Sequence, residues 1–510
     1  MKEWVREHRI ILAILGGALL YRCFALTGDM LFDPVVYAQN AFNLLEGTFT
    51  LDTTAWFSHR LTVFLPVAPL YAAFGVHPWT SKLWPLLCSM AQLGLAAALG
   101  LRLFERRVVW VGLVLAALAP LDVVYATVLN PDIVISTFLT AAVVCWILGY
   151  ESPHPRRVLL FASGVCLALA IVTRLFGVIL VPFYLLWILW KRPAWRDLWP
   201  GVLWGAAGVL AVLVPLALVY LWQTGDAAYR LGVVSGRYGE GAKSEGTRFW
   251  YYPSLLLHPR FTITGLAPAA FGLGVLGALV RPNRPRWILL AWGLPILLYL
   301  QFGSMSTHAY IPILKRERFL LPLTIPLCLL AASISVAAVR CLTRGRRRLT
   351  GVVLGLGLLG YAAGSWIVVD RERALGAWRA RAFGDVVAVL EAEPDRPVLF
   401  DHWRTRYRFS YYFGFREGAD FYRGGTDADR IRRPGGFGGS RLGYLAWYPR
   451  ADLLPPCFVV LDDDVSRQIE AGDSITGTYR SGDVPAYASP PPPGWQRIGR
   501  YGTFEVYRVG

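Results

Sequence analysis

The sequence predicts a polytopic α-helical membrane bundle of about eleven transmembrane helices plus interfacial helices, followed by a small C-terminal α/β extracytoplasmic domain. Of the 510 residues, 55% are hydrophobic and only 17% are charged, whereas soluble domains carry about a quarter charged residues. Apolar runs of roughly 20 residues, the length that crosses a bilayer, fill the chain up to Val369. The rest is polar and rich in proline and glycine, so the predicted domains are 1–369 and 370–510.

The net charge of +17 is explained by membrane topology and does not indicate nucleic-acid binding. Lys and Arg residues gather at the ends of apolar runs, where the positive-inside rule places them. No basic face is interleaved with exposed aromatic residues. The seven cysteines show no CxxC or Cys/His spacing typical of a metal site. Cys457 alone belongs to the polar C-terminal part, which excludes an internal disulfide there.

The predicted spans follow from the lengths of the apolar runs. They are 10–27, 82–101, 108–127, 132–150, 157–173, 175–190, 200–222, 263–280, 287–303, 318–340 and 349–369. The first run follows Lys2, Arg6 and Arg9, as in a signal peptide, but lacks an Ala-x-Ala cleavage pattern. We therefore interpret it as a retained first helix.

One further apolar run, 61–75, is short and contains Pro66 and Pro69. Whether it spans the membrane decides the orientation of every later span. If it does not span, the basic clusters that follow later spans share the cytoplasmic side with the N-terminus. If it spans, they all face outward, against the positive-inside rule. We therefore predict an interfacial or re-entrant helix on the outer side. The predicted location is the inner (plasma) membrane, with a cytoplasmic N-terminus and an extracytoplasmic C-terminal domain.

This topology predicts outer loops at 28–81, 223–262 and 304–317. The second is long and contains glycine, and we expect a mobile lid over the site. Its polar candidates are Arg237, Tyr238, Lys243 and Arg248. In the C-terminal part, patterning predicts a helix at 374–393, buried strands at 397–401 and 457–461, and a closing hairpin at 495–508.

Acidic residues at the outer ends of spans are the first candidates for chemistry. Asp29 and Asp33 follow the first span, and Asp132 begins a later one after Asn130-Pro131. Asp33 and Asp132 each suit the N-cap of a helix, which is the structural alternative. Because both would lie at the same outer surface, two carboxylates could instead share a cavity as general base and acceptor-orienting group. A divalent metal is possible there.

Cations placed outside, against the positive-inside bias, are the second group of candidates. They are Arg60, Arg174, Lys315 and Arg318, with His59 beside the first. A lipid phosphate or pyrophosphate is a natural partner, because arginine pairs with phosphate bidentately. Snorkelling to ordinary headgroups is the alternative. The acidic run 462–464 after a predicted strand is better explained as a helix cap than as a metal site.

These residues resemble the C-fold (GT-C) glycosyltransferases, especially the bacterial branch related to protein O-mannosyltransferases and lipid A aminoarabinose transferases. The matching motifs, in chain order, are Asp33-Pro34-Val35-Val36-Tyr37-Ala38, Leu65-Pro66 to Phe74-Gly75, Pro131-Asp132, Thr173-Arg174 and Arg318-Phe319-Leu320-Leu321-Pro322. Two departures stand out: Pro34 replaces a second acid that is frequent in the family, and Phe319 replaces a tyrosine. The first puts a paired-carboxylate metal site in doubt.

The resemblance implies transfer of a sugar from a polyprenyl-phosphate-linked donor to an acceptor hydroxyl at the extracytoplasmic membrane face, with inversion. The acceptor is a lipid, a glycan or a protein. Asp33 would act as general base with support from Asp132. The donor phosphate would be held by Arg174, Arg318 and either Lys315 or Arg60, and the secondary candidates are Asp29, Tyr37 and His59. The alternatives are a transporter or flippase for polyprenyl-linked glycans and a scaffold that binds them without catalysis.

Overall fold

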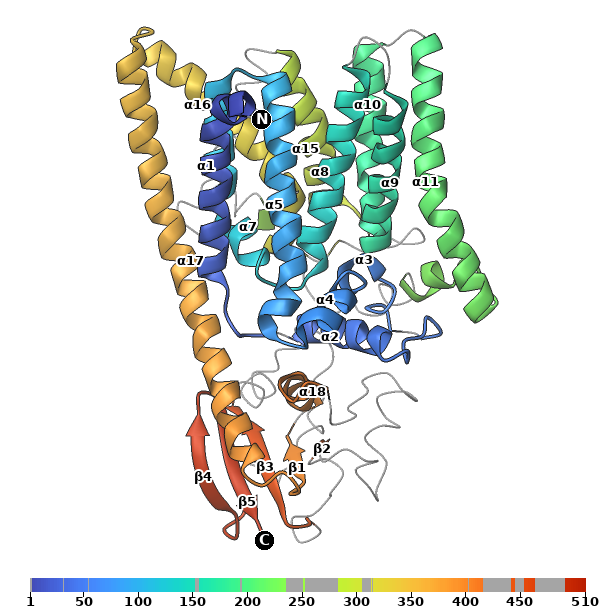
Figure 1. The fold of residues 1–510 in the computed structure, drawn as a ribbon, viewed down its shortest axis with the longest axis vertical. Helices are drawn as coiled ribbons and strands as arrows, with labels where there is room; N and C mark the ends of the chain where they lie inside the picture. Colours follow the sequence, from blue (N-terminus) through green and yellow to red (C-terminus); the bar gives the residue numbers. More distant parts are fainter. Residues whose placement is uncertain are drawn as a thin grey trace.

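The computed structural model describes residues 2–30, 32–53, 55–151, 156–192, 195–234, 251–252, 283–304, 313, 315–401, 403–415, 442–444, 454–463 and 491–510. Long helices run side by side along the long axis of the molecule, and the C-terminal strands gather beyond one end of this bundle (Figure 1). The N-terminus lies near the opposite end.

Most predicted spans are single helices in the structure. These are α1 (Lys2–Ala25), α5 (Pro78–Leu103), α8 (Pro131–Tyr150), α9 (Arg157–Thr173), α11 (Trp195–Thr224) and α15 (Arg284–Phe302). The predicted span 263–280 lies outside the described residues. Helix α11 leaves large apolar side chains such as Leu203, Leu210 and Trp222 exposed. Such a surface is stable in a hydrocarbon layer and costly in water.

Three predicted spans are interrupted. The run 108–127 divides into α6 (Arg106–Ala117) and α7 (Pro120–Tyr125), 175–190 into the 3₁₀ helix η1 (Leu175–Leu180) and α10 (Val181–Lys191), and 318–340 into the 3₁₀ helix η2 (Glu317–Leu323) and α16 (Thr324–Leu342). Proline accompanies each interruption, at Pro120, Pro182 and Pro322. Because proline has no N–H and crowds the preceding turn, an α-helix does not continue unbroken through it.

Short helices lie across the end of the bundle that is nearer the C-terminal domain. They are α2 (Phe32–Leu45), α3 (Leu61–Phe64) and α4 (Val67–Phe74). Together, α3 and α4 correspond to the predicted interfacial run 61–75. At 8 residues, α4 is roughly 12 Å long, well short of a ~30 Å hydrocarbon core. This geometry agrees with an interfacial position.

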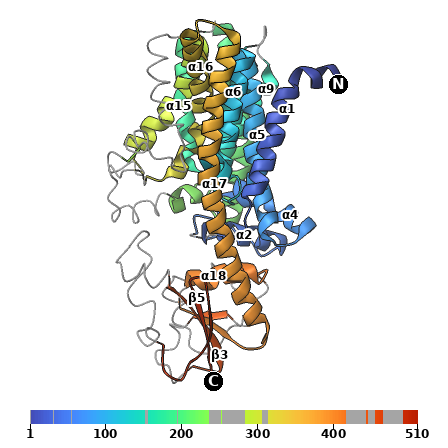
Figure 2. The same cartoon turned by 90° about the vertical axis from the view of Figure 1, so that its left-hand side faces the viewer.

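A single helix, α17 (Arg347–Glu391), replaces the two helices predicted at 349–369 and 374–393. Neither proline nor glycine interrupts residues 365–375, so nothing in the sequence ends the helix at the predicted domain boundary between 369 and 370. With 45 residues it is roughly 68 Å long, about twice what a bilayer core needs. It runs along the bundle and into the C-terminal domain without a break (Figure 2).

The C-terminal domain contains a mixed sheet with the strand order β2-β1-β3-β5-β4. Its strands are β1 (Val398–Phe400), β2 (Leu442–Tyr444), β3 (Cys457–Asp462), β4 (Gln496–Tyr501) and β5 (Phe504–Val509). The first three are parallel, and β5 and β4 join in antiparallel register. The end of α17 and helix α18 (Trp403–Tyr412) cover the sheet, with Phe383, Phe409 and Phe504 in one core. The α/β prediction is confirmed, although it included neither α18 nor β2.

Candidate active site

Four charged side chains from different parts of the chain meet where the bundle faces the C-terminal domain. Asp132 begins α8, Arg174 lies between α9 and η1, Arg318 lies in η2, and Asp33 lies in α2. Arg174 Nη1 is 2.9 Å from Asp132 Oδ1, and Arg318 Nε is 3.3 Å from Asp132 Oδ2. Arg318 Nη1 is also 3.6 Å from Asp33 Oδ2. Arg318 therefore bridges the two carboxylates that the sequence singled out.

Local capping explains why Asp132 is available for these ion pairs. The N-cap of α8 is Asn130, whose side chain accepts a hydrogen bond of 3.0 Å from the backbone N–H of Asp132. The capping interpretation of Asp132 is therefore wrong, and its carboxylate faces the two arginines instead. Helix α2 begins at Phe32, so Asp33 lies inside the first turn rather than before it. A negative charge is favourable there, because the backbone N–H groups of a first turn have no helical partner.

The turn that carries Arg174 is tight. A Cβ atom on Gly177 would lie only 2.6 Å from the backbone nitrogen of Ile171, so only glycine permits this return of the chain against α9. The Arg174 guanidinium lies 4.9 Å from the centre of the Phe319 ring, and that of Arg318 lies 5.8 Å from it. Phe319 thus packs against both cations through its ring alone.

Tyr37 and Arg60 form a second contact beside this cluster. Arg60 Nη1 donates a hydrogen bond of 2.5 Å to Tyr37 Oη, and its guanidinium lies 4.0 Å above the Trp56 ring. Tyr37 follows Asp33 by one helical turn, which places both on the same side of α2. Burial raises the pKa of Tyr37 to about 12, and the charge of Asp33 raises it as well. The Tyr37 hydroxyl therefore keeps its proton at neutral pH.

His59 and Lys315 are differently placed. His59 Nε2 donates to the Thr53 carbonyl at 2.9 Å, and Nδ1 accepts from the Tyr220 hydroxyl at 2.9 Å. Burial lowers the pKa of His59, which favours this neutral ring between α11 and the outer loop. Lys315 is buried just before η2. Neither side chain has a described contact to Asp33 or Asp132.

Asp29 is separated from Asp33 although only four positions divide them. Its carboxylate oxygens lie 3.6 Å from Arg379 Nη1 on α17 and 3.6 Å from Arg408 Nη2 on α18. The structure therefore brings together Asp33, Asp132, Arg174 and Arg318, with Tyr37 and Arg60 adjacent, and directs Asp29 toward the C-terminal domain.

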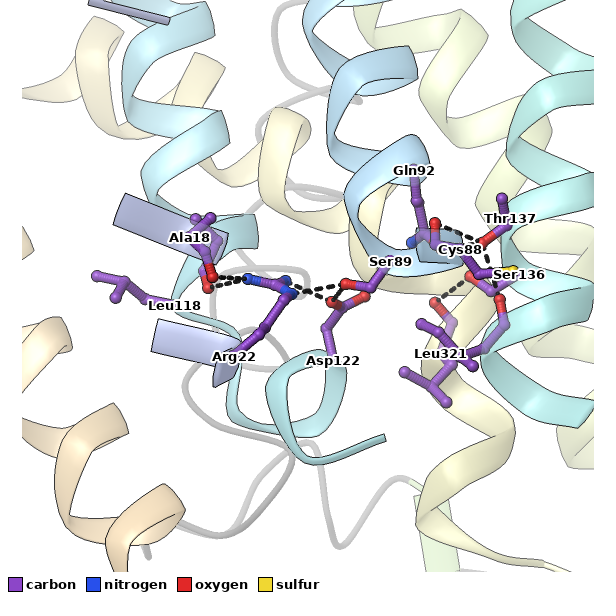
Figure 3. A network of polar contacts seen from close by, with 12 residues as sticks. Ala18, Arg22, Cys88, Ser89, Gln92, Leu118, Asp122, Ser136, Thr137 and Leu321 are labelled. Atoms are coloured by element: carbon purple, nitrogen blue, oxygen red, sulfur yellow. Dashed lines mark hydrogen bonds and ion pairs between the residues drawn. The ribbon is translucent and has the colours of Figure 1, made fainter. Parts of the chain in front are cut away.

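Sequence reasoning missed a buried ion pair inside the bundle (Figure 3). Arg22 Nη2 lies 2.5 Å from Asp122 Oδ1, and Arg22 Nε donates to Ser89 Oγ at 2.7 Å. Ser89 Oγ also donates to Asp122 Oδ1 at 2.5 Å. The pair fixes α7, which packs against η2 and so supports Arg318. The available signal was an ionisable residue in each of the predicted spans 10–27 and 108–127, because such residues at membrane depth are rare and need a partner.

Arg230 was also missed. Its Nη2 atom donates to the carbonyl oxygens of Ile171 and Val172 at 2.7 and 2.8 Å. These carbonyls lie in the last turn of α9, where no helical N–H reaches them. Burial lowers the pKa of Arg230 to about 10, so the guanidinium is still charged at neutral pH. Arg230 thereby holds the helix end that leads into Arg174.

The divalent metal that the sequence analysis allows at this site stays a prediction. No group of three or more His, Cys, Asp or Glu side chains that could hold a metal ion occurs among them. The Arg318 guanidinium lies against both Asp33 and Asp132, in the place that a cation bridging the two carboxylates would take.

Two further sequence candidates can be followed only in part. In the acidic run 462–464, Asp462 ends β3 and Asp463 pairs with Arg500 on β4. Residue 464 and the helix expected after it lie outside the described residues, as do the lid candidates of 237–248.

The bundle, the short helices across its end and the terminal domain together make up the C-fold (GT-C) of integral membrane glycosyltransferases. The structure of ArnT from Cupriavidus metallidurans bound to undecaprenyl phosphate matches with a TM-score of 0.65 and 14% sequence identity, covering 99% of both chains. The archaeal oligosaccharyltransferase AglB from Archaeoglobus fulgidus, in complex with an inhibitory peptide and a dolichol-phosphate, matches with a TM-score of 0.57 and 12% identity. That match covers 99% of this chain and 75% of AglB.

The sequence comparisons are narrower. Residues 62–222 match the family described as dolichyl-phosphate-mannose-protein mannosyltransferase. None of the curated proteins matches the chain. The GT-C fold and the multi-pass membrane architecture predicted from the sequence are confirmed.

Proposed function

We propose that this protein is a polyprenyl-phosphate-sugar-dependent glycosyltransferase (a hexosyl or pentosyl transferase) that acts on an acceptor hydroxyl at the extracytoplasmic membrane face. The observation that carries the proposal is the contact of two carboxylates with two arginines at one end of a GT-C bundle. The similarity to structures that hold undecaprenyl phosphate and dolichol-phosphate supports a lipid-linked donor.

The exposure of the two acids separates their roles. The Asp33 side chain is 32% exposed, whereas that of Asp132 is 3% exposed and has both arginines within 3.3 Å. A general base must reach the proton that it removes. Asp33 is therefore the base, and Asp132 neutralises part of the charge of Arg174 and Arg318.

In the proposed reaction, Asp33 takes the proton of the acceptor hydroxyl as its oxygen bonds to the anomeric carbon. The bond from that carbon to the phosphate oxygen breaks on the opposite face, and the polyprenyl phosphate leaves with the electron pair. The configuration at the anomeric carbon inverts. Arg174 and Arg318 stabilise the charge that develops on the leaving phosphate.

The charge balance suits a phosphate. Arg60, Arg174 and Arg318 outnumber Asp33 and Asp132 by one positive charge, which suits an anionic lipid phosphate. Arg318 lies 3.3 and 3.6 Å from its acids, longer than the roughly 2.7–2.9 Å of a strong charge-assisted hydrogen bond. A lipid phosphate can therefore replace these contacts without breaking a well-made ion pair.

The proposed orientation in the inner membrane has a cytoplasmic N-terminus and an extracytoplasmic site. It is supported by the placement of the N-terminus and the C-terminal domain at opposite ends of the bundle and by the positive-inside rule. The site cluster and the short helices lie at the end with the C-terminal domain.

The test uses the purified full-length protein and a panel of undecaprenyl-phosphate-linked sugars, with envelope lipid, glycan and protein fractions as acceptors. We expect release of undecaprenyl phosphate by the wild-type protein and a fall of about 10²–10⁴-fold for Asp33→Asn, the range lost with a general base. The matched control is Asp52→Asn, which alters an exposed acid in the same outer loop and should retain turnover.

Normal turnover by folded Asp33→Asn would remove Asp33 from the mechanism. Binding of undecaprenyl phosphate without turnover on any acceptor fraction would favour a transporter or a binding protein.

A further inference from the structure

The segment 27–30 joins α1 to α2 and ends three residues before Asp33. It is held closely by the bundle. A Cβ on Gly376 of α17 would lie 2.8 Å from Thr27 Oγ1, and one on Gly28 would lie 3.1 Å from Ala380 Cβ. Lys82 of α5 donates to the Thr27 carbonyl at 2.5 Å. One side of this segment therefore packs directly against α17 and α5.

The C-terminal domain holds the other side through Tyr412 of α18. The Tyr412 hydroxyl donates to the Gly28 carbonyl at 3.0 Å and accepts from the Met30 N–H at 3.1 Å. Its ring stacks on Phe383 of α17 with the ring centres 4.7 Å apart and the planes at 12°. The Tyr412 hydroxyl thus fixes the Gly28 carbonyl and the Met30 N–H, one on each side of Asp29. The Tyr412 ring is itself held in place by its stacking on Phe383.

The Asp29 carboxylate strengthens the same contact. Its side chain is buried and lies 3.6 Å from both Arg379 of α17 and Arg408 of α18. Arg408 in turn lies 4.3 Å above the Phe383 ring. A buried carboxylate is costly unless cations and donors surround it, and here the C-terminal domain supplies one of the two cations. The domain and the segment 27–30 therefore stabilise each other.

We propose that α18 is a positioning element for the general base: it fixes the segment 27–30 so that the first turn of α2 holds Asp33 against Arg318. This inference rests on the proposed function. Helix α18 also packs along α2, and just beyond the end of α18 the Phe415 ring lies 5.4 Å from the Phe42 ring of α2. A shift of about 1 Å at a reacting group can lower a rate by up to roughly 100-fold, so loosening Met30 affects catalysis without any contact to substrate.

Two neighbouring tyrosines of α18 provide a matched test. Tyr411 also has a buried hydroxyl, but it pairs with Ser81 of α5 at 2.7 Å and not with the segment 27–30. Tyr412→Phe and Tyr411→Phe each remove one hydroxyl from the same helix and keep the ring. Both would be compared with the wild-type full chain by steady-state kinetics with an undecaprenyl-phosphate sugar and by hydrogen exchange of the amides of 28–35.

For Tyr412→Phe we expect kcat to fall about tenfold, the donor KM to stay within about twofold, and the amide of Met30 and the first turn of α2 to exchange faster. Tyr411→Phe should keep the wild-type kcat and exchange in this segment. Unchanged kcat and exchange in Tyr412→Phe, or an equal loss of kcat in Tyr411→Phe, would overturn the proposal.

The exchange measurement needs no substrate and separates this inference from the proposed function. If the wild-type protein shows no turnover but Tyr412→Phe alone speeds exchange at 28–35, the enzymatic function fails while the restraint by α18 holds. If the wild type turns over and Tyr412→Phe changes neither readout, only the positioning role fails.

Discussion

The bundle contains two groups of ion pairs that use the same residue types in different ways. In the pair inside the bundle, the side chains of Arg22 and Asp122 are 0% and 2% exposed, with their closest atoms 2.5 Å apart. In the cluster at the end of the bundle, Arg318 is 26% exposed and lies 3.3 and 3.6 Å from its two carboxylates. The first group is closed and satisfied. In the second, Arg174 pairs closely with Asp132 at 2.9 Å, but Arg318 is partly exposed and loosely paired.

This difference separates a structural role from a functional one. Arg22 also donates to Ser89 and to the carbonyls of Ala18 and Ala117, so its donors are used within the protein. Arg318 is the side chain that can bind an added anion, because it can replace a long contact to a carboxylate with a shorter hydrogen bond to that anion. A charged residue in a membrane bundle is therefore better judged by how completely its partners enclose it than by its presence alone.

The largest expected effect comes from breaking the closed pair. Arg22→Met leaves the Asp122 carboxylate buried with no guanidinium, and removing one partner of a buried pair costs about 3–5 kcal/mol. The measurement is thermal unfolding in detergent. The double variant Arg22→Met/Asp122→Leu should recover much of the loss, because no lone charge remains. Equal destabilisation by the single and double variants would contradict this account.

Removing the Arg318 guanidinium from the cluster at the end of the bundle should instead weaken donor binding. Arg318→Met removes charge-assisted hydrogen bonds to the donor phosphate, worth roughly 1.5–3 kcal/mol or about 10–100-fold in donor KM. Its contact to the partly exposed Asp33 contributes at most about 1 kcal/mol to stability, and the buried Asp132 keeps its 2.9 Å contact to Arg174. Kinetics at varied donor concentration and a melting curve test both statements. A large fall in melting temperature with an unchanged KM would assign Arg318 to structure.

A smaller effect with a distinctive pattern is expected at Asp132. Asp132→Asn keeps the shape of the side chain and releases the charges of Arg174 and Arg318 toward the phosphate. Donor KM should fall, and kcat should fall about tenfold, because the enzyme then holds the donor and the leaving lipid phosphate too tightly. A rise in KM would show that Asp132 orders the arginines more than it neutralises them.

The smallest effect is a pH dependence at His59. Burial lowers its pKa from the ordinary 6.5, so the folded protein keeps the ring neutral while the unfolded chain takes up a proton. The stability present above pH 6.5 is therefore lost as the pH falls through the folded pKa. The melting temperature should drop more between about pH 7.5 and about pH 5.5 for the wild type than for His59→Gln. Equal drops would remove His59 as the cause.

Residues at the outer ends of spans were predictable, and residues within spans were not recognised. Asp33, Asp132, Arg174 and Arg318 stand where a polar turn interrupts apolar sequence, so topology alone gathers them at one surface. Arg22 lies within an apolar run, where hydropathy averages its charge away. The sequence predicts two helices where the structure has the single 45-residue helix α17. Its composition changes from apolar to polar near residue 369, but the helical conformation continues.

The C-terminal domain was predicted by class but not in detail. Strands β1 and β3 are apolar and buried, so their sequences predict them directly. Helix α18 is rich in arginine and tyrosine, so its sequence is polar on average and does not indicate a buried helix. Its position depends on long-range contacts, including those of Tyr412 with the segment 27–30.

The sequence by itself determined the class of protein, the predicted spans and the surface on which the charged candidates lie. Hydrophobic length and charge asymmetry are local properties that the bilayer acts on directly. Only the tertiary structure decided which carboxylate meets which arginine, because Asp33, Asp132, Arg174 and Arg318 come from distant segments. It also directed Asp29 to α17 and α18 and Asp33 to Arg318. The sequence alone does not show that Asp29 and Asp33, only four residues apart, point to different partners. The start of α2 and the packing of α18 set the two directions.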